Sequence, residues 1–128
     1  MREIKFRAWD KKLKRIRKVV RIDFSDLTAD LFHSTSANSR SYVHLRRFTD
    51  IELMQCTFLR DKNGVEIYEG DIIKKTGDIK TYSIVFDGVL AAYLMDDGTG
   101  GYGLNQMLLR DFEIIGNIYE NSELLNKA

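Results

Sequence analysis

The chain of 128 residues is long enough for one ordinary domain or two small ones, and its hydrophobic content of 44% can fill a modest core. It has no apolar run of membrane-helix length, no secretory signal at its start and a single cysteine, Cys56, so the sequence predicts a cytoplasmic protein without a disulfide or a cysteine zinc site. The net charge is +1, but the charges are unevenly distributed along the chain. Residues 1–50 carry 13 Lys/Arg and 6 Asp/Glu, whereas residues 51–128 carry 7 Lys/Arg and 13 Asp/Glu. This asymmetry indicates an anionic partner or pairing of the two halves.

Residues 1–24 carry the pattern of two antiparallel strands. In the segments EIKFRAW and RIRKVVRI, apolar residues alternate with cationic ones, so a hairpin of the two would have one apolar and one basic face. The predicted apolar face consists of Ile4, Phe6, Ala8, Ile16, Val20 and Ile22. The predicted basic face, which also carries the chain's tryptophan, consists of Lys5, Arg7, Trp9, Arg15, Arg17 and Arg21. A helix over residues 13–24 is the less favoured alternative, because apolar residues also recur there at helical spacing.

Two short polar motifs separate the halves of the chain. The segment HSTSANSRS, residues 33–41, predicts a polar loop. The segment TDIE, residues 49–52, matches a capping box and predicts a helical turn before the apolar segment LMQCTFL.

Glycine marks the turns of the second half. Asp87-Gly88 separates TYSIVF from VLAAYLM, and Asn63-Gly64 separates QCTFLRDK from VEIYEGDIIKK. Such pairs predict hairpin turns of type I′, in which both central residues need positive φ. Gly70 interrupts a strand pattern as a bulge or barrel corner would, and FEIIGNIY is a further strand with a bend at Gly116. Several short strands between turns predict a small antiparallel barrel or sandwich, and NSELLNKA predicts a brief C-terminal helix.

Three motifs resemble sites for a metal, a nucleotide or catalysis, but each lacks a required part. The acids Asp61, Glu66, Glu69 and Asp71 offer oxygen ligands, yet the EF-hand loop needs glycine at its sixth position and DKNG places it at the fourth. The segment GTGGYG matches G-x-G-x-x-G without the long helix that a dinucleotide site needs. Cys56 is the candidate catalytic residue, but it lies on the apolar side of its predicted strand, and a cysteine in such a position is usually buried and inert. The sequence therefore predicts no catalytic residue, no metal site, no cofactor and no enzymatic activity.

The predicted basic face is the strongest candidate for binding. Its cations and Trp9 resemble the charged, aromatic surfaces with which proteins hold single-stranded nucleic acid. Six phosphate contacts predict a slope of log K against log salt of about −4 to −5. The alternatives are packing against the acidic half, within the chain or in a homo-oligomer, and binding of a protein partner. We favour these alternatives over nucleic acid, and we expect no membrane partner.

Three segments together resemble the YopX family of phage and prophage proteins: MREIKFRAWDKK at residues 1–12, ELMQCTFLRDKNGVEIYEGDIIK at residues 52–74 and FEIIGNIYENSELL at residues 112–125. The resemblance implies a phage or prophage origin, a bacterial host cytoplasm and a C-terminal domain similar to an SH3-type β-barrel, but no catalytic residue. The family usually has tyrosine and glycine where this chain has Cys56 and Phe58. A phenylalanine in place of that glycine predicts that the backbone there does not need positive φ.

The sequence thus predicts a mainly β protein with few short helices. A basic, β-rich N-terminal region covers residues 1–50, and an acidic, SH3-like β-barrel resembling the YopX family covers residues 51–128. The expected function is non-enzymatic binding of a macromolecule or self-assembly. Nucleic-acid binding by the basic hairpin is the alternative, and a small-molecule enzyme is a less favoured one.

Overall fold

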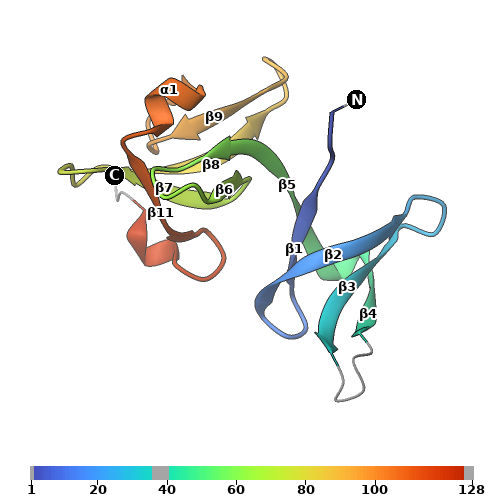
Figure 1. Cartoon of the computed structure of the whole chain (residues 1–128). Coiled ribbons are helices and arrows are strands. Elements are labelled where there is room, and N and C mark those ends of the chain that lie inside the picture. The colour runs from blue at the N-terminus through green and yellow to red at the C-terminus, as the bar shows by residue number, and fades with distance from the viewer. Residues whose placement is uncertain (1, 36–40, 126–128) are drawn as a thin grey trace. The chain divides into compact units, whose positions relative to one another are not determined.

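The computed structural model describes residues 2–35 and 41–125, and the chain divides into two compact units, Met1–Gln55 (unit 1) and Cys56–Ala128 (unit 2) (Figure 1). The protein is mainly β, with antiparallel sheets and few short helices, as predicted. Strand pairing among the described residues leaves the sheets open, without closure into a barrel. The predicted boundary after residue 50 falls at the start of a long strand, Ile51–Arg60, whereas the division between the units falls inside that strand.

Unit 1 is an antiparallel sheet with the strand order β4-β3-β2-β1-β5. Its elements are β1 (Phe6–Asp10), β2 (Arg15–Asp23), β3 (Thr28–Thr35), β4 (Ser41–Arg47), the 3₁₀ turn η1 (Phe48–Asp50) and the first half of β5 (Ile51–Arg60). The buried core of this unit consists of Ala8, Ala29, Leu31 and Ile51. The predicted N-terminal hairpin is confirmed as β1 and β2, so the alternative helix over residues 13–24 is wrong.

The two polar motifs between the halves take different forms from those predicted. Strands β3 and β4 extend into the predicted loop at residues 33–41, and residues 36–40 lie outside the described part of the chain. The helical turn predicted for residues 49–52 is present as η1, but it begins at Phe48 and no side chain caps it.

The register of β1 and β2 overturns the predicted arrangement of faces. Residues directly opposite each other in an antiparallel pair share a face, and Ala8 lies opposite Arg17. A residue of the predicted apolar face and one of the predicted basic face therefore point to the same side. The reason is the connecting turn at residues 11–14, which places Asp10 opposite Arg15. Alternation within each strand does not fix this register.

Three hairpin turns of the protein share one chemistry. In each, an aspartate Oδ1 accepts hydrogen bonds of 2.8–3.3 Å from the backbone N–H groups two and three residues later. These aspartates are Asp10, Asp23 and Asp87. The last residue of each turn has positive φ, and these residues are Lys14, Leu27 and Ala91. The hairpin predicted at Asp87-Gly88 is confirmed, but the type I′ turn is wrong, because residues 88–91 form the connection.

Unit 2 contains a second antiparallel sheet with the strand order β10-β9-β8-β7-β11. Its elements after β5 are β6 (Glu66–Tyr68), β7 (Asp71–Lys75), β8 (Thr81–Asp87), β9 (Ala92–Asp96), β10 (Gly101–Gly103), α1 (Gln106–Leu109), β11 (Phe112–Asn117) and η2 (Ser122–Leu124). The buried core consists of Ile67, Ile73, Ile84, Met95, Leu109 and Phe112. The bend predicted at Gly116 is confirmed, because the register of β11 against β7 shifts there. Within the described residues, the predicted C-terminal helix is the single 3₁₀ turn η2.

Two further turn predictions concern glycines of unit 2. Gly64 has a φ of 79° at the reversal between β5 and β6, so the predicted reversal is confirmed there, although Asn63 does not share the positive φ of a type I′ turn. Gly70, with a φ of 83°, lies at the corner between β6 and β7, which agrees with the predicted interruption of the strand.

Phe58 adopts a φ of 61°, in the left-handed region that favours glycine. It lies in β5 where the register against β6 shifts between Cys56 and Arg60, which marks a bulge. The hydroxyl of Thr57 holds this bulge, because Oγ1 donates to O of Ile67 at 2.7 Å and accepts from N of Leu59 at 3.1 Å. The prediction that this position does not need positive φ is therefore wrong, since Phe58 itself adopts positive φ at the bulge.

We expect the Phe58→Gly variant to be more stable than Phe58→Ala by about 1 kcal/mol, because alanine retains the strain of a left-handed backbone and glycine does not. Both variants lose the aromatic side chain, so their difference isolates the backbone. Urea denaturation measures the two free energies of unfolding. Lys74→Gly and Lys74→Ala, in β7, are the control pair. There the glycine variant should be the less stable of the two, because glycine loses more backbone entropy on folding. Equal stability of Phe58→Gly and Phe58→Ala would contradict the assigned strain.

Candidate functional site

A groove of about 450 Å³ opens on unit 1. It is lined by Ile4, Lys5, Phe6, Val19, Val20, Arg21, Ile22, Phe24 and Gln55. Most of these side chains are apolar, yet several face solvent, since Val20 is 55% exposed and Phe24 is 73% exposed. The volume lies within the range of about 300–1,000 Å³ that is typical of ligand pockets. The groove therefore offers an exposed apolar surface with cations beside it.

A bulge in β2 builds this groove. The register of β2 against β3 shifts between Val19 and Arg21, which leaves Val20 as the extra residue. A bulge bends its strand and redirects side chains, so consecutive residues no longer alternate strictly between the two faces. This explains why Val19, Val20 and Arg21 all line the same groove. Val19 and Ile22 also pack against the buried core of unit 1.

The structure does not bring the six predicted binding residues together on one face. Lys5 and Arg21 line the groove, and Arg15 is exposed at the start of β2. Arg7 and Trp9 are half-buried and lie on the face of β1 opposite to that of Ala8. The sixth residue, Arg17, is buried. The groove therefore combines two residues of the predicted basic face with four of the predicted apolar face, which are Ile4, Phe6, Val20 and Ile22.

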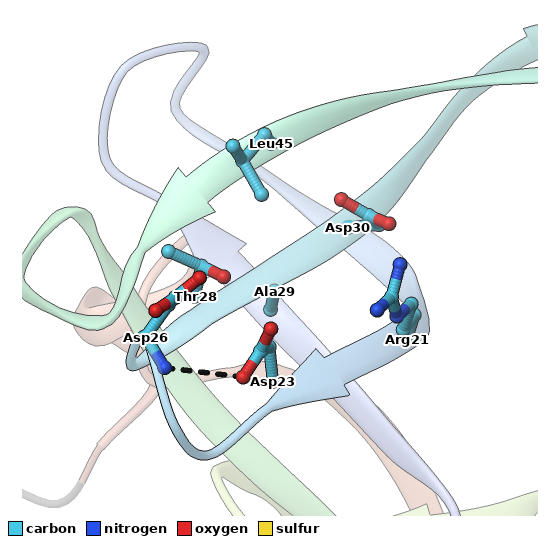
Figure 2. Close-up of a pocket in the computed structure, with 7 residues that line it drawn as sticks. All are labelled: Arg21, Asp23, Asp26, Thr28, Ala29, Asp30 and Leu45. Atoms are coloured by element: carbon cyan, nitrogen blue, oxygen red, sulfur yellow. Dashed lines mark hydrogen bonds between the residues drawn. The ribbon is translucent and has the colours of Figure 1, made fainter.

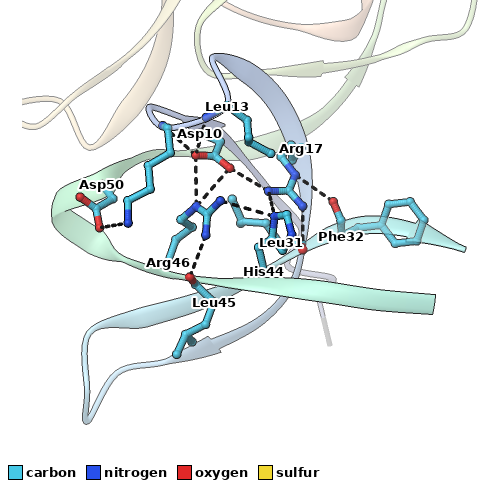
Figure 3. Close-up of polar contacts among 10 residues, drawn as sticks. Asp10, Leu13, Arg17, Leu31, Phe32, His44, Leu45, Arg46 and Asp50 are labelled. Atoms are coloured by element: carbon cyan, nitrogen blue, oxygen red, sulfur yellow. Dashed lines mark hydrogen bonds and ion pairs between the residues drawn. The ribbon is translucent and has the colours of Figure 1, made fainter. Parts of the chain in front are cut away.

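Arg17 belongs to a buried polar cluster (Figure 3). Its Nη1 donates to Oδ2 of Asp10 at 2.7 Å, and the two side chains are 3% and 0% exposed. Its other donors hold β3, since Nε donates to O of Phe32 at 2.9 Å and Nη2 to O of Leu31 at 3.2 Å. The prediction that Arg17 is an exposed binding residue is corrected, because its guanidinium joins three strands inside unit 1.

Asp10 is the acceptor at the centre of this cluster. Besides Arg17, Nε of Arg46 lies 3.3 Å from Oδ2, and the backbone N–H groups of Lys12 and Leu13 donate to Oδ1. Burial raises the pKa of Asp10, but the hydrogen bonds from Arg17, from these two amides and from Arg46 together outweigh it and hold the pKa below its usual value. Asp10 thus links the β1–β2 turn to β2 and β4.

His44 and His33 extend the cluster along β4 and β3. Nδ1 of His44 accepts from Nη1 of Arg17 at 3.2 Å, and the two imidazole rings stack with centroids 4.0 Å apart. Burial, then the charges of His33, Arg17 and Arg46, lower the pKa of His44, and the carboxylate of Asp10 only partly opposes them. His44 therefore acts as a neutral acceptor, and this role gives it a structural place in unit 1.

A second hollow on unit 1 is smaller and more polar (Figure 2). Its volume is about 150 Å³, and it is lined by Arg21, Asp23, Asp26, Thr28, Ala29, Asp30 and Leu45. Asp23 is already used by its turn, since Oδ1 accepts from N of Ser25 and N of Asp26. The volume falls below that of typical ligand sites, so the larger groove is the better candidate.

The acidic stretch after β5 is explained by turn chemistry. Oδ1 of Asp61 accepts from N of Asn63 and N of Val65, and Oδ2 accepts from N of Ile114 at 3.1 Å. Oδ2 of Asp71 accepts from N of Tyr68 at 2.8 Å. Within residues 2–35 and 41–125, no group of three or more potential metal ligands comes together. The two buried aspartates therefore satisfy backbone amides.

The glycine-rich segment at residues 98–103 and Cys56 both contribute residues to β-strands. Gly101–Gly103 form β10, which pairs with β9 instead of opening a helix. Oδ1 of Asp97 accepts from N of Thr99 and N of Gly100, and its Oδ2 lies 2.7 Å from Nζ of Lys80. Cys56 is buried in β5, as its alternation predicted. Of the helices in the described residues, none has the length and apolar character that crossing a membrane requires.

Comparison with known proteins identifies similar chains. A family model described as YopX protein matches residues 5–126. Among solved structures, protein EF1440 from Enterococcus faecalis is 28% identical, with a TM-score of 0.69 over 98% of this chain and 100% of that chain. Protein YopX from Bacillus subtilis is 17% identical, with a TM-score of 0.61 over 97% of each chain, and shares the fold. No curated protein matches the sequence.

Proposed function

The chain belongs to the YopX family, and we propose that it is a non-enzymatic binding protein that holds a segment of a protein partner in the groove of unit 1. The observation that carries the proposal is the groove of about 450 Å³, whose apolar lining is left exposed at Val20 and Phe24. Exposed apolar surface that is contiguous and has polar groups beside it is typical of protein interaction sites.

The chemistry of the groove selects a segment that is both apolar and acidic. Burial of Val20 and Phe24 by apolar side chains of the partner would supply the main favourable term. Arg21 is exposed beside them and would attract carboxylates. Unit 1 as a whole carries 13 Lys/Arg and 7 Asp/Glu, so its field also favours an acidic partner.

Nucleic-acid binding by the basic hairpin is less well supported. Arg17 is buried, and the register of β1 and β2 distributes the remaining predicted cations over both faces of the hairpin. A nucleic-acid strand needs cations aligned along its backbone, with an aromatic side chain that is free to stack. An apolar groove with few cations fits a protein segment better.

The finer architecture and setting are part of the same proposal. We take unit 2 as a relative of the SH3-type barrel, supported by its five short antiparallel strands and the additional pairing of β6 with β5. Small barrels of that type often serve as recognition modules, which is an analogy of fold. We further propose that the protein has a phage or prophage origin and acts in the cytoplasm of a bacterial host, as the family resemblance implies.

Selection from a random peptide library tests the proposal. The wild-type protein should enrich peptides that combine apolar with acidic residues, and the Val20→Glu variant should not, because a carboxylate in the groove repels acids and cannot be buried among apolar groups. Val43→Glu, at an exposed position of β4 outside the groove, is the matched control and should select like the wild type. Equal enrichment by wild type and Val20→Glu would contradict the proposal.

Polynucleotide binding is the outcome that would favour the alternative. Titration of labelled single-stranded and double-stranded DNA against the protein at several salt concentrations measures it. Four phosphate contacts, from Lys5, Arg7, Arg15 and Arg21, would give a slope of log K against log salt of about −2.8 to −3.6. A slope of that size, lost on substitution of Arg15 and Arg21, would replace the protein partner with nucleic acid.

A further inference from the structure

The tip of the β8–β9 hairpin is an exposed apolar feature of unit 2. Val89 is 94% exposed and Leu90 is 65% exposed, both within the turn at residues 88–91. Phe86 is exposed just before the turn and meets Tyr93 edge to face, with ring centroids 5.4 Å apart. Such side chains at a protruding tip are costly in water unless another surface covers them.

Among residues 2–35 and 41–125, no strand pairs with this tip from either side. β7 pairs with β8 up to Ser83, and β10 pairs with β9 from Leu94 onward. Residues 86–87 of β8 and residues 92–93 of β9 therefore pair only with each other in the register, as the end of a two-stranded ribbon that extends beyond the neighbouring strands (Figure 1). A two-stranded ribbon is marginally stable alone, so packing against a further surface would stabilise it.

The tip has the chemistry that the groove of unit 1 would select. Residues 81–97, TYSIVFDGVLAAYLMDD, contain three aspartates and no lysine or arginine. Unit 2 as a whole carries 7 Lys/Arg and 12 Asp/Glu, a net charge of −5, whereas unit 1 has a net charge of +6. The groove presents apolar side chains beside Arg21, and the tip presents apolar side chains beside Asp87. The two surfaces are therefore complementary in polarity and in charge.

We propose that the β8–β9 tip of one copy occupies the groove of unit 1 in a second copy of this chain. The inference rests on the proposed function, and it names the protein segment that the groove binds. Each copy carries one groove and one tip, so two copies can exchange both contacts in a closed two-fold dimer, or successive copies can repeat one contact head to tail. In both arrangements, Val89 and Leu90 pack on Val20 and Phe24.

Sedimentation of the full chain at increasing concentration tests this contact, with one variant for each side. Wild type should associate over a range of about 1–200 µM. Val20→Glu in the groove and Leu90→Glu at the tip should each weaken association about tenfold or more, because each places a carboxylate in an apolar contact. Both positions are exposed, so folding should be retained, which circular dichroism checks. Met107→Glu, at an exposed position of α1, is the control and should associate like the wild type.

The decisive experiment is sedimentation of a mixture of Val20→Glu and Leu90→Glu. The intact tip of Val20→Glu fits the intact groove of Leu90→Glu, so the mixture should form a complex although each variant alone is weakened. A wild type that stays monomeric, or a Leu90→Glu variant that associates like the wild type, would overturn the self-contact. If the library selection still succeeds through Val20 in that case, the groove binds a different protein. If the selection fails as well, the proposed function fails with it.

Discussion

Replacement of Asp10 with asparagine is expected to lower the free energy of unfolding of unit 1 by about 3–5 kcal/mol. Asp10 is the carboxylate between Arg17 and Arg46, with side-chain exposures of 0%, 3% and 13% respectively. The asparagine keeps the shape but leaves two guanidinium groups without their counter-charge in surroundings of low polarity. Urea denaturation followed by fluorescence measures the change in unit 1, because Trp9 is the chain's tryptophan.

The same carboxylate makes the stability of unit 1 depend on pH. The folded-state pKa of Asp10 is lowered, since its hydrogen bonds from Arg17, Lys12, Leu13 and Arg46 outweigh the effect of burial. Its contribution is therefore fully present above the unfolded value of about 3.9 and is lost as the pH falls through the lower folded-state pKa. The Asp10→Asn variant should lack this acid-dependent part of the stability.

An exposed ion pair in the same unit is the matched control. Nζ of Lys11 lies 3.2 Å from Oε1 of Glu52, with side chains 45% and 48% exposed. Glu52→Gln should change the free energy of unfolding by less than about 1 kcal/mol, because solvent screens the pair. Adding Arg17→Met to Asp10→Asn should recover part of the loss, since one uncompensated cation is removed. A loss for Asp10→Asn no larger than that for Glu52→Gln would contradict the buried-charge account.

Alternation and turn residues were enough to predict the strands but not how the strands align. The hairpin of β1 and β2 and the hairpin at Asp87 follow from apolar periodicity and turn chemistry. Register depends on the number of residues in each turn, and a four-residue connection is not visible in the alternation. Phe58 shows the same limit, because its positive φ is set by pairing with β6, a contact that a local pattern does not contain.

The candidate site was only partly predictable for a related reason. Lys5 and Arg21 were identified by charge and Val20 by alternation, whereas the bulge that places Val20 and Arg21 in the same groove depends on pairing with β3. Arg17 looks like its cationic neighbours in the sequence, and its burial depends on Asp10 across the hairpin and on strands that come later in the chain. Long-range partners decide whether a cation is a surface group or a buried structural one.

Replacement of Asp61 with alanine is expected to lower the free energy of unfolding of unit 2 by about 3–4 kcal/mol. The carboxylate is buried and accepts from N of Asn63 at 2.9 Å, N of Val65 at 3.0 Å and N of Ile114 at 3.1 Å. A hydrogen bond to a charged acceptor contributes about 1.5–3 kcal/mol, and the three contributions are not additive. The circular dichroism signal of the tyrosine side chains, followed during urea denaturation, measures this change, because unit 2 contains five of the six tyrosines.

Asp87→Ala separates the local from the long-range part of this effect. Asp87 also accepts from two backbone amides of its turn, those of Val89 and Leu90, but both lie within three residues of it. Its loss should therefore cost about 1 kcal/mol, as for other local side-chain caps. Asp61 adds the bond to Ile114, 53 residues away in β11, which ties the β5–β6 turn to the sheet. Equal losses for the two variants would show that this long-range bond contributes nothing, and that the turn alone needs the carboxylate.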